Sequence, residues 1–306
     1  MRGVSHDSSP RAAAGGCLRS SADLLSRRYV GEDPAVDISE VVPMKPRILT
    51  HEVKGEGPPL VLLPGGLTGW VSWASYADSL AARWQTVRVQ PIHNELGSAG
   101  ERGDAEYTAD IERDSLLMTL DALNIAAADF VGWSGGGRAL IEFALAYPER
   151  VRTLTLVEPA AYWILDQLGE TDPEVAHLNR FFHDLAGEDV SEDDLAEFCQ
   201  LAGLVSSADK ARRNPHWASW VPHRMALSWG SEQADRPRRG VDELAGISCP
   251  VLLVHGNATT DWLKRVVAVL DERLPDARVL ELPGDHASHL ENPDVFPAEL
   301  ERHLDR

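Results

Sequence analysis

The chain has 306 residues, 43% of them hydrophobic, so it can bury a substantial core as one large domain or two small ones. A formal net charge of -19 repels phosphate backbones and anionic lipid, which argues against nucleic acids and membrane surfaces as partners. Its three cysteines, Cys17, Cys199 and Cys249, are too scattered for a disulfide framework or a metal cluster, and they predict a reducing, cytoplasmic setting. We find no apolar run near the roughly 18 residues needed to span a bilayer and no signal-peptide core.

Residues 1–43 are rich in Ser, Arg, Ala, Gly and Asp and have no clear periodicity. We therefore expect a disordered N-terminal extension, followed by one domain over residues 44–306. An over-extended start assignment is the alternative interpretation, because Met44 stands just before the first strand-like run.

Strand-like and helix-like stretches alternate from Ile48 onward, which is typical of an α/β protein with a mostly parallel sheet covered by helices. The elements expected first are a strand at 60–63, a helix around 70–81, a strand through 87–89, a helix at 107–123, a strand leading into Ser134, a helix at 138–147 and a strand at 151–157. The elements expected near the C-terminus are a strand at 250–255, a helix at 262–274, a strand at 277–282 and a closing helix at 296–304.

Strand signals vanish between about 160 and 245. This mixed helical stretch contains several aromatic residues, namely Trp163, Phe181, Phe182, Trp217, Trp220 and Trp229. We interpret it as an insertion over the sheet, which divides the domain into a core (44–159 and 246–306) and a cap (160–245).

A short apolar run, Phe130 and Val131, leads into the sequence Gly132-Trp133-Ser134-Gly135-Gly136, and a helical pattern follows. A Gly-x-Ser-x-Gly turn between strand and helix lifts the serine hydroxyl out of the backbone, because the glycines leave room for the strained turn. Ser134 is therefore the candidate nucleophile. A serine hydroxyl needs a base within hydrogen-bond reach and an acid to orient that base. Of the 11 histidines, His286 is best placed, in a loop after the last expected strand.

Three motifs occur in the order typical of one family: the turn Pro64-Gly65-Gly66, the elbow at 132–136, and His286-x-x-His289-x-Glu291-x-Pro293. Over about residues 48–304 the chain resembles the α/β-hydrolase superfamily, as a serine-nucleophile member with a helical cap. The resemblance implies an α/β-hydrolase fold, a cap inserted between strands six and seven, and His286 rather than His289 as the base. It implies no cofactor.

The acid is where the chain departs from the family pattern. Members often carry an aspartate three residues after the glycine that ends the seventh strand, but that position is Thr259 here, and Asp261 lies two residues beyond. Other members place the acid at the end of the sixth strand, where this chain has Glu158. We favour Glu158 and keep Asp261 as the alternative. A helix cap is the non-catalytic interpretation of Glu158.

The oxyanion hole needs two donors. The backbone N–H of Gly135, at a helix N-terminus, supplies one, and the N–H of Gly66 is expected to supply the other. The non-catalytic interpretation of the Gly66 turn is a plain strand-to-helix connection.

The sequence does not match the motifs for nucleotide or metal binding that share some of these residues. Gly132 and Gly137 have the spacing of a P-loop, but Arg138-Ala139 replaces its Lys-Ser/Thr pair, and a dinucleotide fingerprint would need a glycine where Ser134 stands. No metal site is expected from His286 and His289, because no glutamate follows the first histidine. For His93, in a loop after the strand at 87–89, we favour a structural role.

Trp133 and Trp70 lie beside the nucleophile and the oxyanion turn, and with the cap tryptophans they suggest an apolar or aromatic acyl pocket. The sequence thus predicts a serine hydrolase acting on an ester, lactone or thioester of a small apolar acyl substrate. The alternative is a non-hydrolytic member of the fold: a ligand-binding receptor or scaffold, or an acyltransferase or lyase. The oligomeric state is left open.

Overall fold

The computed structural model describes residues 44–104, 106–230 and 240–306. The expected N-terminal extension, residues 1–43, lies outside the described residues, as do residues 231–239 of the expected cap. Among the described residues, no helix is both long enough and apolar enough to cross a membrane.

The described chain forms a seven-stranded sheet in the order β1-β3-β2-β4-β5-β6-β7. The strands are β1 (Thr50–Lys54), β2 (Pro59–Leu63), β3 (Gln85–Gln90), β4 (Ala128–Trp133), β5 (Val151–Val157), β6 (Val251–Gly256) and β7 (Ala277–Leu282). Only β1 is antiparallel to its neighbour, β3. The carboxyl ends of the other strands therefore meet at one edge, where α/β folds place their ligands.

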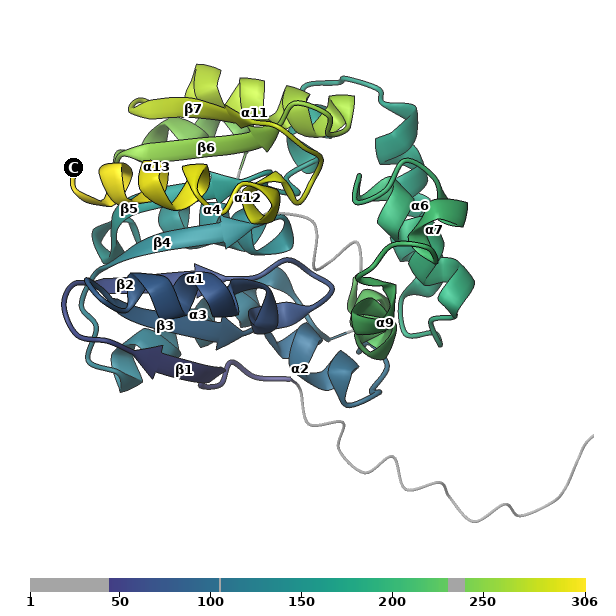
Figure 1. Cartoon of the computed structure of the whole chain (residues 1–306), viewed down its shortest axis with the longest axis horizontal. Helices are drawn as coiled ribbons and strands as arrows, with labels where there is room; N and C mark the ends of the chain where they lie inside the picture. The colour runs from purple at the N-terminus through teal and green to yellow at the C-terminus, as the bar shows by residue number, and fades with distance from the viewer. Residues whose placement is uncertain (1–43, 105, 231–239) are drawn as a thin grey trace, which may run out of the picture. The chain divides into compact units, whose positions relative to one another are not determined.

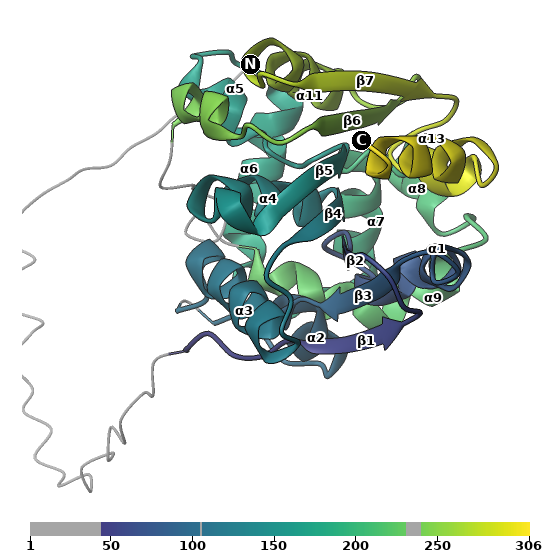
Figure 2. The same cartoon turned by 90° about the vertical axis from the view of Figure 1, so that its left-hand side faces the viewer.

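Helices cover both faces of the sheet, as a parallel sheet requires. The helices of the core are α1 (Ala74–Leu80), α2 (Ile92–Ser98), α3 (Ala109–Ala122), α4 (Gly135–Ala146), α11 (Asp261–Arg273), α12 (Ser288–Glu291) and α13 (Val295–Leu304), with 3-10 turns η1 (Gly69–Trp73) and η2 (Pro148–Arg150). Helices α1 and α13 lie on one face, and α3, α4 and α11 lie on the other (Figures 1 and 2).

Residues of β2 alternate between these two faces, as side chains of a strand must. Leu60 and Leu62 pack in the cluster that contains Phe296 of α13. Val61 and Leu63 pack in the larger cluster on the opposite face. Because both faces of β2 are buried, its sequence is a continuous apolar run.

The segment between β5 and β6 forms only helices among the residues described there. These are α5 (Trp163–Gln167), α6 (Pro173–Leu185), α7 (Glu192–Leu201), α8 (Ala208–Ala211), α9 (Trp217–Trp220), η3 (Val221–Trp229) and η4 (Val241–Gly246). The insertion lies between β5 and β6 of the described strands. The expected position, between strands six and seven, was given in the numbering of the family. Helices α6, α7 and α9 stand beyond the arrowheads of the parallel strands (Figure 1).

Short elements differ from the sequence expectation. His93 and His289, both expected in loops, lie in α2 and α12. Helices this short show little periodicity in the sequence. Helix α4 begins at Gly135, before the expected start at Arg138. The sequence pattern missed its first turn because glycines have a low helix propensity.

Candidate active site

Ser134 lies between the end of β4 and the start of α4, in a backbone conformation with φ 52° and ψ -117°. A non-glycine residue with positive φ is strained, so the surrounding structure must hold it in place. The N–H of Ser134 donates to the carbonyl of Val157 at 2.9 Å, and its own carbonyl accepts from the N–H groups of Arg138 and Ala160 at 3.0 and 3.1 Å. These three bonds fix the turn that presents the hydroxyl.

The glycines around Ser134 are required by space. A Cβ atom on Gly132 would lie 2.7 Å from Leu140 Cδ1 and 2.8 Å from the backbone of Gly136. A Cβ atom on Gly136 would lie 2.4 Å from the carbonyl oxygen of Pro64. The elbow therefore packs against the Pro64 turn without room for side chains.

His286 lies in the loop after β7, and its Nδ1 atom is 2.5 Å from Oε2 of Glu158. The ring is buried, with 3% of the residue exposed. Its backbone is held from two sides, because its N–H donates to the carbonyl of Gly203 at 3.3 Å and its carbonyl accepts from Trp133 Nε1 at 2.9 Å. We assign the Nδ1 proton from this hydrogen-bond pattern, which leaves Nε2 as the basic nitrogen.

Glu158 is fully buried, directly after β5. Besides His286, it accepts hydrogen bonds from the N–H of Gly256 at 2.6 Å and from Thr259 Oγ1 at 2.8 Å. A buried carboxylate is costly unless its oxygens have such partners. These donors therefore hold the carboxylate in place beside the imidazole.

Of the two candidate acids, the structure brings Glu158 and not Asp261 to His286. Asp261 is exposed in the first turn of α11. Thr259, which stands at the position of the common family aspartate, donates its hydroxyl proton to Glu158. Sequence reasoning noted Thr259 only as a missing acid. The signal it overlooked is that a hydroxyl there can support a carboxylate at the end of the neighbouring strand.

Gly66 and Gly135 lie next to each other. A Cβ atom built on Gly135 would be 3.6 Å from the backbone nitrogen of Gly66. The Gly66 turn is held by Asn94, whose side-chain amide donates to the carbonyls of Gly66 at 2.9 Å and Leu67 at 3.3 Å. Asn94 is fully buried, and sequence reasoning gave it no specific role.

Ser134, Gly66, Gly135 and His286 all line one cavity of about 140 Å³. Its wall is largely apolar and aromatic, and includes Tyr107, Tyr162, Trp163, Leu178, Phe182, Phe198, Leu227, Trp229 and Trp262. Helices α6 and α7 and the turn η3, all in the insertion between β5 and β6, contribute many of these side chains. The site therefore suits a small, mostly apolar molecule.

The expectation that Trp133 and Trp70 line the pocket is wrong, because neither belongs to the cavity wall. Trp133 lies behind His286, with ring centroids 5.5 Å apart, and Trp70 packs under the guanidinium of Arg88 at 5.5 Å. Proximity in sequence misled here, because Trp133 packs in the cluster that contains Phe296 of α13 and Trp70, in η1, packs against Arg88. The aromatic wall comes instead from the insertion between β5 and β6, from α11 and from Tyr107.

His289 has a packing role. Its ring centroid lies 4.9 Å from that of Trp133 and 5.1 Å from that of Trp73. Complete burial, and secondarily the neighbouring His286, lower the pKa of His289 to about 3. Among the described residues, no group of three or more His, Cys, Asp or Glu side chains is arranged to hold a metal ion.

A parallel sheet with helices on both faces and a strained serine at the end of a central strand is the architecture of an α/β hydrolase. A family model described as the alpha/beta hydrolase fold matches residues 58–293. The chain belongs to this family.

Two curated proteins are similar to the chain in sequence. The chain is 30% identical over 248 residues to a pimeloyl-[acyl-carrier protein] methyl ester esterase of Aeromonas hydrophila subsp. hydrophila, an alignment covering 79% of the chain and 93% of the relative. It is 26% identical over 255 residues to a zearalenone hydrolase of Bionectria ochroleuca, covering 80% of the chain and 89% of the relative. These relatives are hydrolases, and we assign the chain to the hydrolases of this fold.

Solved structures agree on the architecture. A hydrolase from Pseudomonas aeruginosa superposes with a TM-score of 0.66 at 20% identity, covering 84% of the chain and 94% of that structure. An enol-lactonase from Burkholderia xenovorans gives a TM-score of 0.62 at 20% identity, covering 84% of the chain and 96% of that structure. At this identity, the likeness is one of fold.

Proposed function

We propose that the chain is a serine hydrolase that cleaves an ester, lactone or thioester of a small, apolar acyl substrate. The observation that carries the proposal is the buried contact of 2.5 Å between His286 Nδ1 and Glu158 Oε2, at a cavity that Ser134 also lines. The esterase and hydrolase names of the relatives support the same reaction class.

The mechanism follows from this arrangement. Ser134 Oγ attacks the carbonyl carbon, and Nε2 of His286 takes the hydroxyl proton and returns it to the leaving group. Glu158 keeps the imidazole oriented and stabilises the imidazolium that forms. The N–H groups of Gly66 and Gly135 donate to the oxyanion, each worth about 3 kcal/mol in the transition state. Water then releases the acyl group by the same steps.

Ser134→Ala tests the nucleophile. We expect wild-type protein to react with a fluorophosphonate probe at Ser134 and to hydrolyse p-nitrophenyl esters of short acids. We expect Ser134→Ala to lose the labelling and at least about 10³-fold of kcat, because no attacking hydroxyl remains. Lactones and thioesters in the same panel identify the preferred bond.

Ligand binding without labelling or turnover in folded wild-type protein would argue for the receptor alternative. Acyl transfer to an added alcohol in preference to water would argue for the transferase. We also propose a cytoplasmic location, which the unpaired thiols of Cys199 and Cys249 support.

A further inference from the structure

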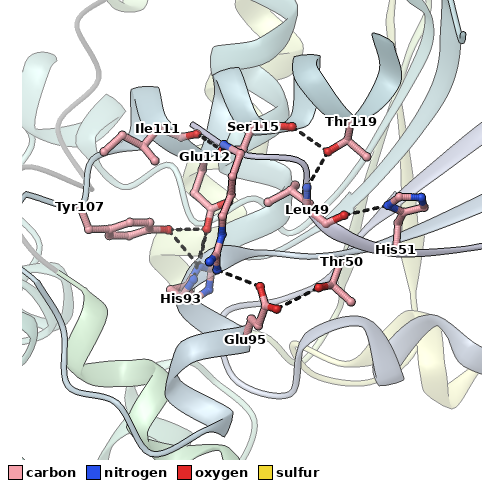
Figure 3. A network of polar contacts seen from close by, with 11 residues as sticks. Leu49, Thr50, His51, His93, Glu95, Tyr107, Ile111, Glu112, Ser115 and Thr119 are labelled. Atoms are coloured by element: carbon pink, nitrogen blue, oxygen red, sulfur yellow. Dashed lines mark hydrogen bonds and ion pairs between the residues drawn. The ribbon is translucent and has the colours of Figure 1, made fainter. Parts of the chain in front are cut away.

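His93 begins a polar network at the wall of the cavity, just after β3 and in the first turn of α2 (Figure 3). Its Nδ1 atom lies 3.0 Å from Tyr107 Oη and 3.2 Å from Glu112 Oε1. The hydroxyl of Tyr107 donates to the same carboxylate oxygen at 2.7 Å. The backbone N–H of His93 also points at Glu112 Oε1, at 3.3 Å. Tyr107 and Glu112 thus both contact the Nδ1 edge of the ring.

The network assigns the proton on the His93 ring. A carboxylate only accepts hydrogen bonds, and the hydroxyl proton of Tyr107 is directed to Glu112, so both neighbours accept from Nδ1. The neutral ring therefore carries its proton on Nδ1 and presents a lone pair at Nε2. Among the described residues, Nε2 makes no hydrogen bond to the protein.

Nε2 of His93 lies beside the Gly66 turn. It lies 3.9 Å from the point where a Cβ atom of Gly66 would stand, and Gly66 is a proposed oxyanion donor. His93, Tyr107 and Glu112 line the same cavity as Ser134. A group bound at Nε2 would therefore sit within a few bonds of the carbonyl that Ser134 attacks.

The charges around the cavity do not select an ionised substrate group. The lining carries two arginines, Arg113 and Arg138, and two glutamates, Glu112 and Glu142, whose formal charges cancel. A carboxylate on the substrate would face the lone pair of Nε2 with Glu112 behind it. The group that fits is a neutral donor, and a hydroxyl is the smallest.

We propose that His93 determines substrate specificity, with Nε2 accepting a hydrogen bond from a hydroxyl close to the scissile carbonyl. This inference rests on the proposed hydrolase function and deepens it: the preferred substrates are hydroxyacyl esters or hydroxylated lactones. An unsubstituted acyl chain would cover the lone pair of Nε2 without a donor, which costs affinity. The role of His93 is therefore more than the structural one favoured from sequence, while Asn94 beside it holds the oxyanion turn.

Matched substrates test the proposal in the full chain. We expect wild type to hydrolyse p-nitrophenyl 2- or 3-hydroxybutyrate with a kcat/KM about 10-fold above that of p-nitrophenyl butyrate. His93→Phe should bring this ratio to about one. His177→Phe, on the exposed side of α6, is the matched control and should keep the wild-type ratio. Glu112→Gln, which removes the carboxylate that fixes the Nδ1 proton, should lower the ratio part of the way.

The outcomes separate this inference from the proposed function. Wild-type turnover and Ser134 labelling with no preference for either hydroxybutyrate would overturn the role of His93 and leave the hydrolase proposal standing. A hydroxyl preference that survives in folded His93→Phe would also overturn it. If His93→Phe is recovered only unfolded, Glu112→Gln decides. No labelling and no turnover of any ester would overturn both proposals.

Discussion

Glu158 faces the imidazole of His286. Replacing it tests which of the two candidate acids, Glu158 or Asp261, acts with His286. In Glu158→Gln, the amide can neither stabilise the imidazolium nor hold the same tautomer, so we expect kcat to fall roughly 10³–10⁴-fold. The matched control, Asp261→Asn, changes an exposed carboxylate and should leave kcat close to that of wild type. Steady-state kinetics on one ester suffice. A Glu158→Gln enzyme with near-normal kcat would contradict the assignment.

At the residue scale, local motifs were predictable and contacts across the sheet were not. Ser134 could be singled out because its turn is encoded in five consecutive residues. The proximity of Glu158 to His286 was one of two predictions and is now observed in the geometry, while its catalytic role stays a prediction. The supporting bonds of Thr259 and Asn94 join separate segments, and only the position of Thr259, at the usual site of the family aspartate, offered a signal for one of them.

The elbow between β4 and α4 depends on close backbone packing, which Gly136→Ala tests. The added Cβ would approach the carbonyl oxygens of Pro64 at 2.4 Å and Leu63 at 2.7 Å, and neither can move without shifting the oxyanion turn. We expect a loss of about 1–3 kcal/mol in the free energy of unfolding, measured in urea, together with a lower kcat.

Gly246→Ala is the matched control for that substitution. Gly246 is exposed, and a Cβ atom there would meet only Leu145 Cδ2, at 3.9 Å. Its stability and kcat should match those of wild type. Equal stability of Gly136→Ala and Gly246→Ala would disprove the packing argument.

At the scale of elements, the sequence predicted those whose pattern was strong. The strands at 151–157 and 277–282 have the expected bounds. Helices α2 and α12 were missed because each has too few residues to show a helical period. The wall of the cavity was misassigned for a different reason: many of its side chains come from the helical insertion between β5 and β6, and their directions depend on how those helices pack.

For the whole molecule, stability should fall in acid because buried histidines resist protonation. Burial lowers the pKa of His289 to about 3 and of His303 to about 4, from an ordinary 6.5. Below pH 6.5 the unfolded chain therefore binds protons that the folded chain does not, and the free energy of unfolding decreases as pH falls. For His289 the loss is about 1.4 kcal/mol per pH unit, continuing toward pH 3.

His289→Phe should reduce the decrease of the free energy of unfolding at acid pH, since phenylalanine fits the aromatic cluster and takes up no proton. The measurement is urea unfolding of wild type and variant at pH 7, 6 and 5. Burial raises the pKa values of Asp129 and Asp285, which acts in the opposite direction, but it does so equally in both proteins and cancels from their difference. Parallel pH profiles for the two proteins would refute the role of His289.

The pairing of Trp133 with Val157 places Ser134 and Glu158 at the same level on adjacent strands, and both have a left-handed backbone, with φ of 52° and 40°. The proposed nucleophile and the proposed acid thus belong to one continuous strand-helix-strand unit. Only the histidine must arrive from a distant part of the chain, 128 residues beyond Glu158. The loop after β6 therefore does not have to supply a carboxylate to His286. What it supplies to Glu158 is the hydroxyl of Thr259.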